Sequence, residues 1–147
     1  MTGAIQDPAA SVDRATTVLR VLLLATFVSS VVHYTDNYVR FDEYPPADDG
    51  FVTRPLIWQS WILFTAVGAV GYLLYRREHW FPAAACLAFY AVSGLISPLH
   101  YTEGAWSEFD LFQHFFIVTD FLCGVGVLGF AAWLVVHASR SRSVQPV

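Results

Sequence analysis

Four apolar segments of bilayer length divide this chain. They cover residues 16–34, 55–75, 80–97 and 111–136, and polar or proline-containing stretches separate them. A helix needs about 20 mostly apolar residues to cross the hydrocarbon core of a membrane. Charged residues make up only 14% of the 147 positions, against about 25% in an ordinary soluble domain. We therefore expect an all-α integral membrane protein, with one membrane domain over residues 1–147 folded as an antiparallel bundle of four transmembrane helices.

The first apolar segment has a competing interpretation as a cleaved signal peptide. It is longer than the hydrophobic region of a typical signal peptide, and no Ala-x-Ala cleavage site follows it. The segment leads instead into the sequence His33-Tyr34-Thr35-Asp36-Asn37. We therefore expect this segment to remain in the protein as its first helix.

The arginines predict the orientation of the helices. Arg40 and Arg54 fall on one side of a four-span arrangement, and the other basic residues fall on the side of the two termini: Arg14, Arg20, Arg76, Arg77, Arg140 and Arg142. Because basic residues favour the cytoplasmic side, we expect cytoplasmic termini in a multi-pass protein of the plasma membrane. The acidic loops 35–54 and 98–110 would then face outward. The net charge of −4 and the lack of a basic run argue against nucleic acid as a partner.

Histidines and acids gather at the predicted outer ends of the helices. His33 and Asp36 lie where the first helix ends, and His100 follows the third helix. Asp110 and His114 open the fourth helix and are four residues apart, so they are expected on one helical face. In a bundle with short loops the ends of these helices are neighbours. The pattern predicts a polar pocket close to the outer surface.

Three imidazoles with neighbouring carboxylates are typical of a metal site. His33, His100 and His114 would be the ligands, a count that leaves one position open as in catalytic zinc sites. Asp36 and Asp110 would orient the imidazoles or act as general base. Zinc, iron or copper would suit these ligands, and a haem between two outer histidines is the alternative. Two further interpretations stay open: a proton-handling or ligand-binding pocket without metal, and histidines at the lipid interface with only His114 buried.

Asp120 lies deep in the fourth apolar segment, near the expected midplane of the bilayer. Ionisable residues at that depth are costly and are often functional. Asp120 would serve as a proton relay or as an anchor for a polar group of a ligand. The alternative is a protonated carboxyl group that is hydrogen-bonded to a neighbouring helix through Ser60, Thr65 or Ser93.

The fourth segment also contains a G-x-G-x-x-G pattern, formed by Gly124, Gly126 and Gly129. A dinucleotide-binding loop is excluded, because that motif needs a preceding strand and this one lies within a membrane span. Small residues in membrane helices instead allow close packing, and Gly68 and Gly71 of the second segment fit the same interpretation.

These features favour a small membrane metalloprotein, a hydrolase or an oxidoreductase acting on a lipid-soluble substrate. Asp36, Asp110 and Asp120 are the candidate catalytic residues, although the sequence leaves open whether the protein is an enzyme. The first alternative is a non-catalytic accessory subunit or a membrane module that binds a hydrophobic ligand. A haem-binding electron-transfer protein and a proton-coupled carrier are further alternatives. Expected partners are membrane lipid or a small hydrophobic ligand, with assembly as a homo-oligomer or within a larger membrane complex.

Overall fold

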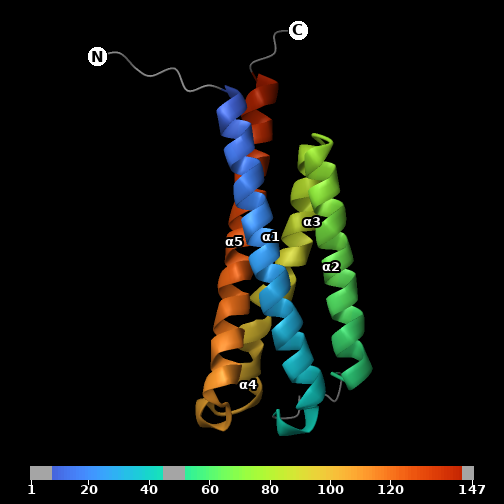
Figure 1. Cartoon of the computed structure of the whole chain (residues 1–147), viewed down its shortest axis with the longest axis vertical. Helices are drawn as coiled ribbons and strands as arrows, with labels where there is room; N and C mark the ends of the chain where they lie inside the picture. Colours follow the sequence, from blue (N-terminus) through green and yellow to red (C-terminus); the bar gives the residue numbers. More distant parts are fainter. Residues whose placement is uncertain (1–7, 45–51, 144–147) are drawn as a thin grey trace, which may run out of the picture.

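The computed structural model describes residues 8–44 and 52–143, and this part of the chain is almost entirely helical (Figure 1). Its long helices are α1 (Pro8–Val39), α2 (Arg54–Arg76), α3 (Trp80–Leu95) and α5 (Leu111–Ser143). The connections contain the short helices η1 (Phe41–Glu43), η2 (Ser97–Leu99), α4 (His100–Glu103) and η3 (Trp106–Glu108). The predicted all-α class and four-helix bundle are confirmed.

Within the described ranges, four stretches are long and apolar enough to cross a membrane: Asp13–Val39, Arg54–Arg76, Trp80–Glu103 and Leu111–Arg140. They confirm the predicted spans, but three of them run further than predicted. The first and fourth continue beyond residues 34 and 136, because no proline or glycine follows directly to end the helix. The third continues past Pro98, which lies in the first turn of η2, where proline is tolerated.

The helices are arranged so that both termini lie at one end of the bundle (Figure 1). We call this the terminal end. The distal end, opposite to it, contains η1, the start of α2 and the short helix α4 (Figure 1). α3 packs against both α2 and α5, and α1 packs mainly against α5. α1 and α2 contact each other less extensively than α3 contacts either of its neighbours.

Glycines set the closest helix contacts. A Cβ atom on Gly94 of α3 would overlap the backbone carbonyl oxygen of Asp120, and one on Gly124 of α5 would lie 2.8 Å from the carbonyl oxygen of Ala91. α3 and α5 therefore cross backbone to backbone. Gly68 likewise allows the ring of Tyr90 to approach closely. A Cβ atom on Gly68 would lie 2.7 Å from the nearest ring atoms. The packing interpretation of the glycines is confirmed at these positions.

The remaining predicted glycines differ from one another. Gly71 packs against α3, because its Cβ would lie 3.0 Å from Cβ of Cys86. Gly126 would meet a side-chain atom of Leu22 at 2.9 Å. Gly129 has no neighbouring atom within 4 Å of its Cβ position, so packing among the described residues does not account for it.

The apolar core and most of the buried polar side chains lie toward different ends of the bundle. The apolar core lies toward the terminal end and contains buried residues of α1, α2, α3 and α5, among them Leu19, Tyr75, Leu87, Val127 and Leu134. Buried polar residues lie toward the distal end: Ser29, Ser30, His33, Ser93, Ser97, Gln113 and Asp120. Burying a polar group costs free energy unless it is hydrogen-bonded. The distal end is therefore the candidate location of a binding site.

Candidate functional site

Two histidines face each other at the distal end. His33 lies on α1 and is only 3% exposed, and His100 is the first residue of α4. Their ring centroids are 5.4 Å apart, with the planes tilted by 51°. Residues 67 positions apart in the sequence thus meet because α1 ends beside the turn that follows α3.

These histidines line a pocket of about 330 Å³ between α1, α2 and the α3–α4 segment. Its walls are largely apolar, and its polar lining residues are His33, Tyr34, Asn37, Ser60, Ser93, Ser97, His100 and Glu103. The volume lies at the lower end of the range for small-molecule sites, roughly 300–1,000 Å³. An apolar pocket with a few convergent polar groups is the usual form of a ligand site. We call it the distal pocket.

Asn37 lines the distal pocket and has a buried amide oxygen without a partner in the described part of the chain. Its Nδ2 lies 3.4 Å from Nε2 of His100. Its Oδ1 is buried, and no atom of the described residues hydrogen-bonds to it. A buried amide oxygen without a partner costs about 1–3 kcal/mol. A donor on a bound molecule would remove that cost.

His114, the third histidine of the predicted set, has a different environment. Its Nδ1 lies 2.9 Å from the hydroxyl of Tyr101, and its ring stacks on Trp106 with a centroid distance of 4.1 Å. The ring of Phe109 lies near both histidines. Its centroid is 6.4 Å from that of His100 and 6.1 Å from that of His114. The structure therefore brings His33 and His100 together and places His114 in a separate aromatic cluster.

Over residues 8–44 and 52–143, no group of three or more His, Cys, Asp or Glu side chains is placed to hold a metal ion. The side chains of Asp110 and His114 have different partners. Asp110 is the N-cap of α5 and binds Gln113 and Arg40, whereas the ring of His114 packs against Tyr101 and Trp106. Metal binding stays a prediction.

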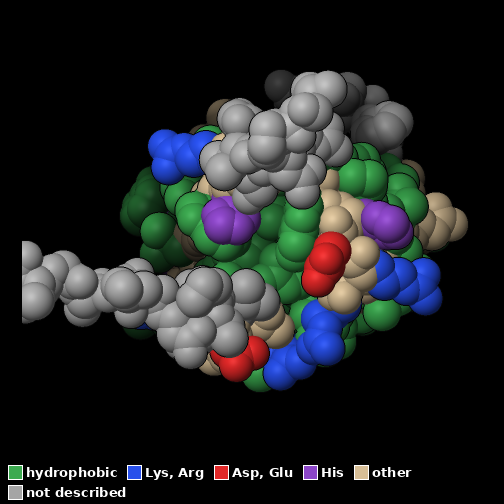
Figure 2. Space-filling model, turned by 90° about the horizontal axis from the view of Figure 1, so that it is seen from above, with side chains coloured by type: hydrophobic (Ala, Val, Ile, Leu, Met, Phe, Trp, Pro, Cys, Tyr) green, Lys and Arg blue, Asp and Glu red, His purple; other side chains and the backbone are tan. Residues whose placement is uncertain are grey.

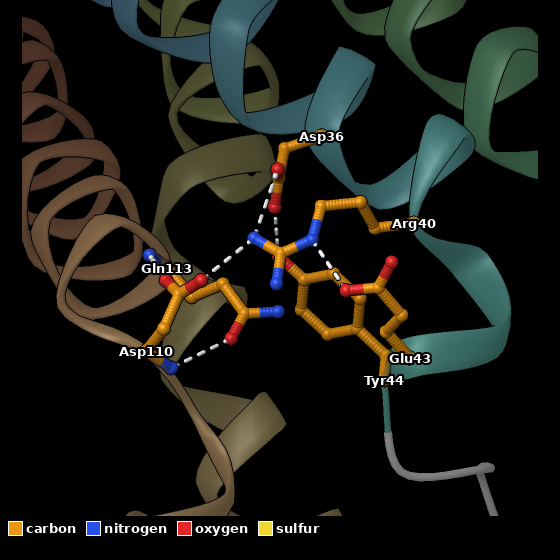
Figure 3. A network of polar contacts seen from close by, with 6 residues as sticks. All are labelled: Asp36, Arg40, Glu43, Tyr44, Asp110 and Gln113. Atoms are coloured by element: carbon orange, nitrogen blue, oxygen red, sulfur yellow. Dashed lines mark hydrogen bonds and ion pairs between the residues drawn. The ribbon is translucent and has the colours of Figure 1, made fainter.

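The carboxylates of Asp36 and Asp110 are engaged by one arginine (Figure 3). Arg40 lies just after α1, and its guanidinium is 3.6 Å from Asp36, 2.8 Å from Asp110 and 2.7 Å from Glu43. The hydrogen bonds to Glu43 and then to Asp110 raise the pKa of Arg40 above its ordinary value. The network joins the end of α1 to the start of α5.

Two further groups complete this network. The hydroxyl of Tyr44 donates to Asp36 at 2.6 Å, and burial together with this bond raises the pKa of Tyr44. Asp110 and Gln113 form reciprocal bonds of 2.8 Å, each backbone N–H donating to the other side chain. This is the capping-box arrangement of a helix start. The bond from the Gln113 backbone, followed by that from Arg40, lowers the pKa of Asp110.

Asp120 is buried at 1% exposure and does not line the distal pocket. Ser29 of α1 donates a hydrogen bond to its Oδ1. Its Oδ2 has no hydrogen-bond partner among the described residues. The expected bond to a neighbouring helix is present, but through Ser29 and not through Ser60, Thr65 or Ser93.

Four residues of this region were missed in the sequence: Ser29, Asn37, Arg40 and Tyr44. Asn37 follows His33 by one helical turn, a signal that becomes visible only if the first helix continues past residue 34. Ser29 stands in an apolar run beside Ser30, and such a pair of hydroxyls predicts a polar contact inside a bundle. For Arg40 and Tyr44 the sequence contains no comparable signal.

In comparisons with known proteins, no family model, no curated protein and no solved structure matches this chain. The function is therefore argued from the geometry of the site.

Proposed function

We propose that this chain is a multi-pass protein of the cell membrane that binds a small, largely apolar molecule with a polar group in the distal pocket. The observation that carries the proposal is the pairing of His33 with His100 beside the unpartnered Oδ1 of Asn37. Such groups are costly to bury in an empty apolar setting and become favourable once a ligand satisfies them.

The arginine distribution gives the proposed orientation. We infer an antiparallel bundle with both termini in the cytoplasm. Most arginines fall on the same side of the four-span arrangement as the two termini, and basic residues favour the cytoplasmic side. The distal pocket then lies in the outer leaflet. A lipid-soluble molecule would reach it from the bilayer, because the pocket opens between helices whose outer surfaces are apolar.

The chemistry of the pocket favours a hydroxyl group on the ligand. Oδ1 of Asn37 can only accept a hydrogen bond, whereas a neutral imidazole offers one donor and one acceptor. Once the Asn37 amide rotates so that Oδ1 faces the pocket, a hydroxyl group can donate to it and accept from His33 or His100 at the same time. The apolar remainder would contact side chains such as Leu56, Ile57 and Ile96, and we therefore propose a hydroxylated lipid-soluble molecule.

Co-purification tests this proposal. The full chain is purified in a mild detergent and extracted with organic solvent, and the extract is analysed by mass spectrometry. We expect a hydroxylated apolar molecule with the wild-type protein and at least a tenfold depletion in His33→Phe and Asn37→Leu. His79→Phe is the control, because His79 is an exposed histidine at the terminal end. Equal amounts in all variants, or no such molecule in any, would contradict the proposal.

Metal binding is the second candidate function, and the 5.4 Å separation of the His33 and His100 rings favours it. Zinc, iron or copper would be held by these imidazoles, with His114 as third ligand after leaving Tyr101. Asp36, Asp110 and Asp120 keep their proposed roles as general base or proton relay, and a haem is the alternative cofactor. Elemental analysis and an absorption spectrum of the purified protein test this candidate. About one equivalent of metal in the wild type, and its loss in His33→Phe, would support it.

A further inference from the structure

Two hollows meet at the terminal end and share one residue, Arg20. The first is an apolar groove of about 410 Å³ between α1 and α2, lined among others by Leu23, Leu24, Phe27 and Ala69. The second is a polar hollow of about 360 Å³, which Arg20 shares with residues of α1 and of the α2–α3 turn, among them Asp13, Thr16, Arg76 and Glu78. An apolar groove and a polar hollow that share one arginine offer the two environments that an amphiphile needs.

Arg20 is held at the junction of the two hollows. Its Nε donates to the hydroxyl of Tyr72 on α2 at 2.9 Å. That bond uses one of the five N–H groups of the guanidinium and leaves the others for a ligand. Since Tyr72 lines the groove and Arg20 lines both hollows, the guanidinium lies where the head of an amphiphile would meet its tail.

The polar hollow contains charges of both signs. In the part of the chain that the structure describes, neither Arg20 nor Arg76 has a carboxylate within 4.0 Å, and neither Asp13 nor Glu78 has a basic group within that distance. Figure 2 looks onto this end and shows basic and acidic side chains next to one another. Two cations and two anions that do not pair with each other are complementary to a ligand that carries both charges.

The groove follows from the packing of α2. Gly68 lets the Tyr90 ring approach, and the small side chain of Ala69 leaves space toward α1. α1 and α2 contact each other less extensively than α2 and α3 do, and the groove lies between them. Thr65 also lines the groove. Its Oγ1 is buried and has no hydrogen-bond partner among the described residues.

We propose that this composite site binds a phospholipid with a phosphoethanolamine head, from the leaflet at the terminal end. The phosphate would bind Arg20 and Arg76, because guanidinium groups suit phosphate oxygens. The ammonium would donate to Asp13 and Glu78, and one acyl chain would occupy the groove. The site is separate from the distal pocket and does not depend on the function proposed for it.

Native mass spectrometry of the full chain in detergent tests this site. The probes are dioleoyl phosphatidylethanolamine, phosphatidylcholine and phosphatidylglycerol, each added alone and then in pairs. We expect the ethanolamine lipid to bind best, since the quaternary ammonium of choline has no N–H to donate to the acids. Preference for the glycerol lipid, or no preference among the three, would overturn the assignment.

Single variants locate the binding. Arg20→Gln and Arg76→Gln should each weaken binding of the ethanolamine lipid about tenfold, because each removes a charged hydrogen bond to phosphate. Arg77→Gln is the matched control, since Arg77 is the exposed neighbour of Arg76 and does not line the hollow. If Arg77→Gln weakens binding as much as both other variants do, the lipid responds to net charge alone and the site is refuted.

Two further variants test the acids and the groove. Glu78→Gln should abolish the preference for ethanolamine over choline while phosphate binding is retained. Ala69→Trp should exclude the acyl chain and reduce the binding of every lipid. Retention of full lipid binding in Ala69→Trp would refute the groove, and a monodisperse elution profile of each variant excludes misfolding as the cause of a loss.

Discussion

Arg40 and Asp110 form an ion pair of 2.8 Å that joins the end of α1 to the N-cap of α5. The two helices carry His33 and His114, so the pair links the helix that lines the distal pocket to the helix that bears the aromatic cluster of His114. Arg40 also contacts Asp36 and Glu43, which makes it the centre of a network and not one partner of an isolated surface pair. Networks of this kind contribute more than single exposed pairs, whose contribution is small.

Arg40→Gln should loosen the distal end without unfolding the bundle. The side chain is 28% exposed, and we expect the Tm to fall by about 2–4 °C in low salt. Thermal denaturation followed by tryptophan fluorescence measures the change. Arg54→Gln is the comparison from the same end, because it breaks the exposed pair of Arg54 with Asp42. An unchanged Tm at low ionic strength would show that the network does not stabilise the fold.

The lowered pKa of Asp110 predicts a dependence of stability on pH. Its folded-state pKa lies below the ordinary value of 3.8, so its contribution is fully present above that value. The contribution is lost as the pH falls through the folded-state pKa. Asp110→Asn removes the charge and keeps a side chain that caps helices well. Wild type should therefore be the more stable protein at pH 6, and the difference in Tm should shrink below about pH 4. A constant difference over that range would contradict the assignment.

Gly94→Ala should be among the most damaging single substitutions, because its methyl group would overlap the backbone of α5 at Asp120. Backbone atoms cannot rotate away as a side chain does, so the helices must separate. We expect a loss of stability of about 3 kcal/mol or more. Gly129→Ala is the matched control on α5. It has open space around it and should be neutral or stabilising by roughly 0.5–1 kcal/mol. Denaturant titration in detergent compares the two variants.

Ser29→Ala should remove the hydrogen bond that Oδ1 of Asp120 accepts from α1. Hydrogen bonds between membrane helices are modest, and we expect a loss of about 1 kcal/mol. The same substitution is also made in the Asp120→Leu background. There the hydrogen bond is already absent, so Ser29→Ala should cause little further loss of stability. Equal losses from Ser29→Ala in both backgrounds would show that the two residues are not coupled.

The sequence predicted the spans well because hydrocarbon imposes a simple rule. Backbone groups must be satisfied within each helix, so apolar length alone locates the four spans. The glycine interpretation succeeded in part. Gly124 meets α3 at Gly94, which was not singled out, whereas Gly129 has no packing neighbour among the described residues.

The arrangement of the site was harder to predict. Topology alone placed His33 near His100. His114 was expected in the same group, but its ring packs against Tyr101 and Trp106, contacts that topology alone does not indicate. Arg40 was read only as a marker of orientation. Nothing in the local sequence indicates that its side chain turns back toward two acids on different elements.

The apolar core and the distal pocket lie toward different ends of the bundle, and this separation has an evolutionary consequence. Folding relies on side chains such as Leu19 and Leu87, whereas recognition would rely on residues at the opposite end. Substitutions around the distal pocket can therefore change which ligand is bound while leaving the apolar core intact. Descendants of this scaffold would be expected to diverge in specificity faster than in shape.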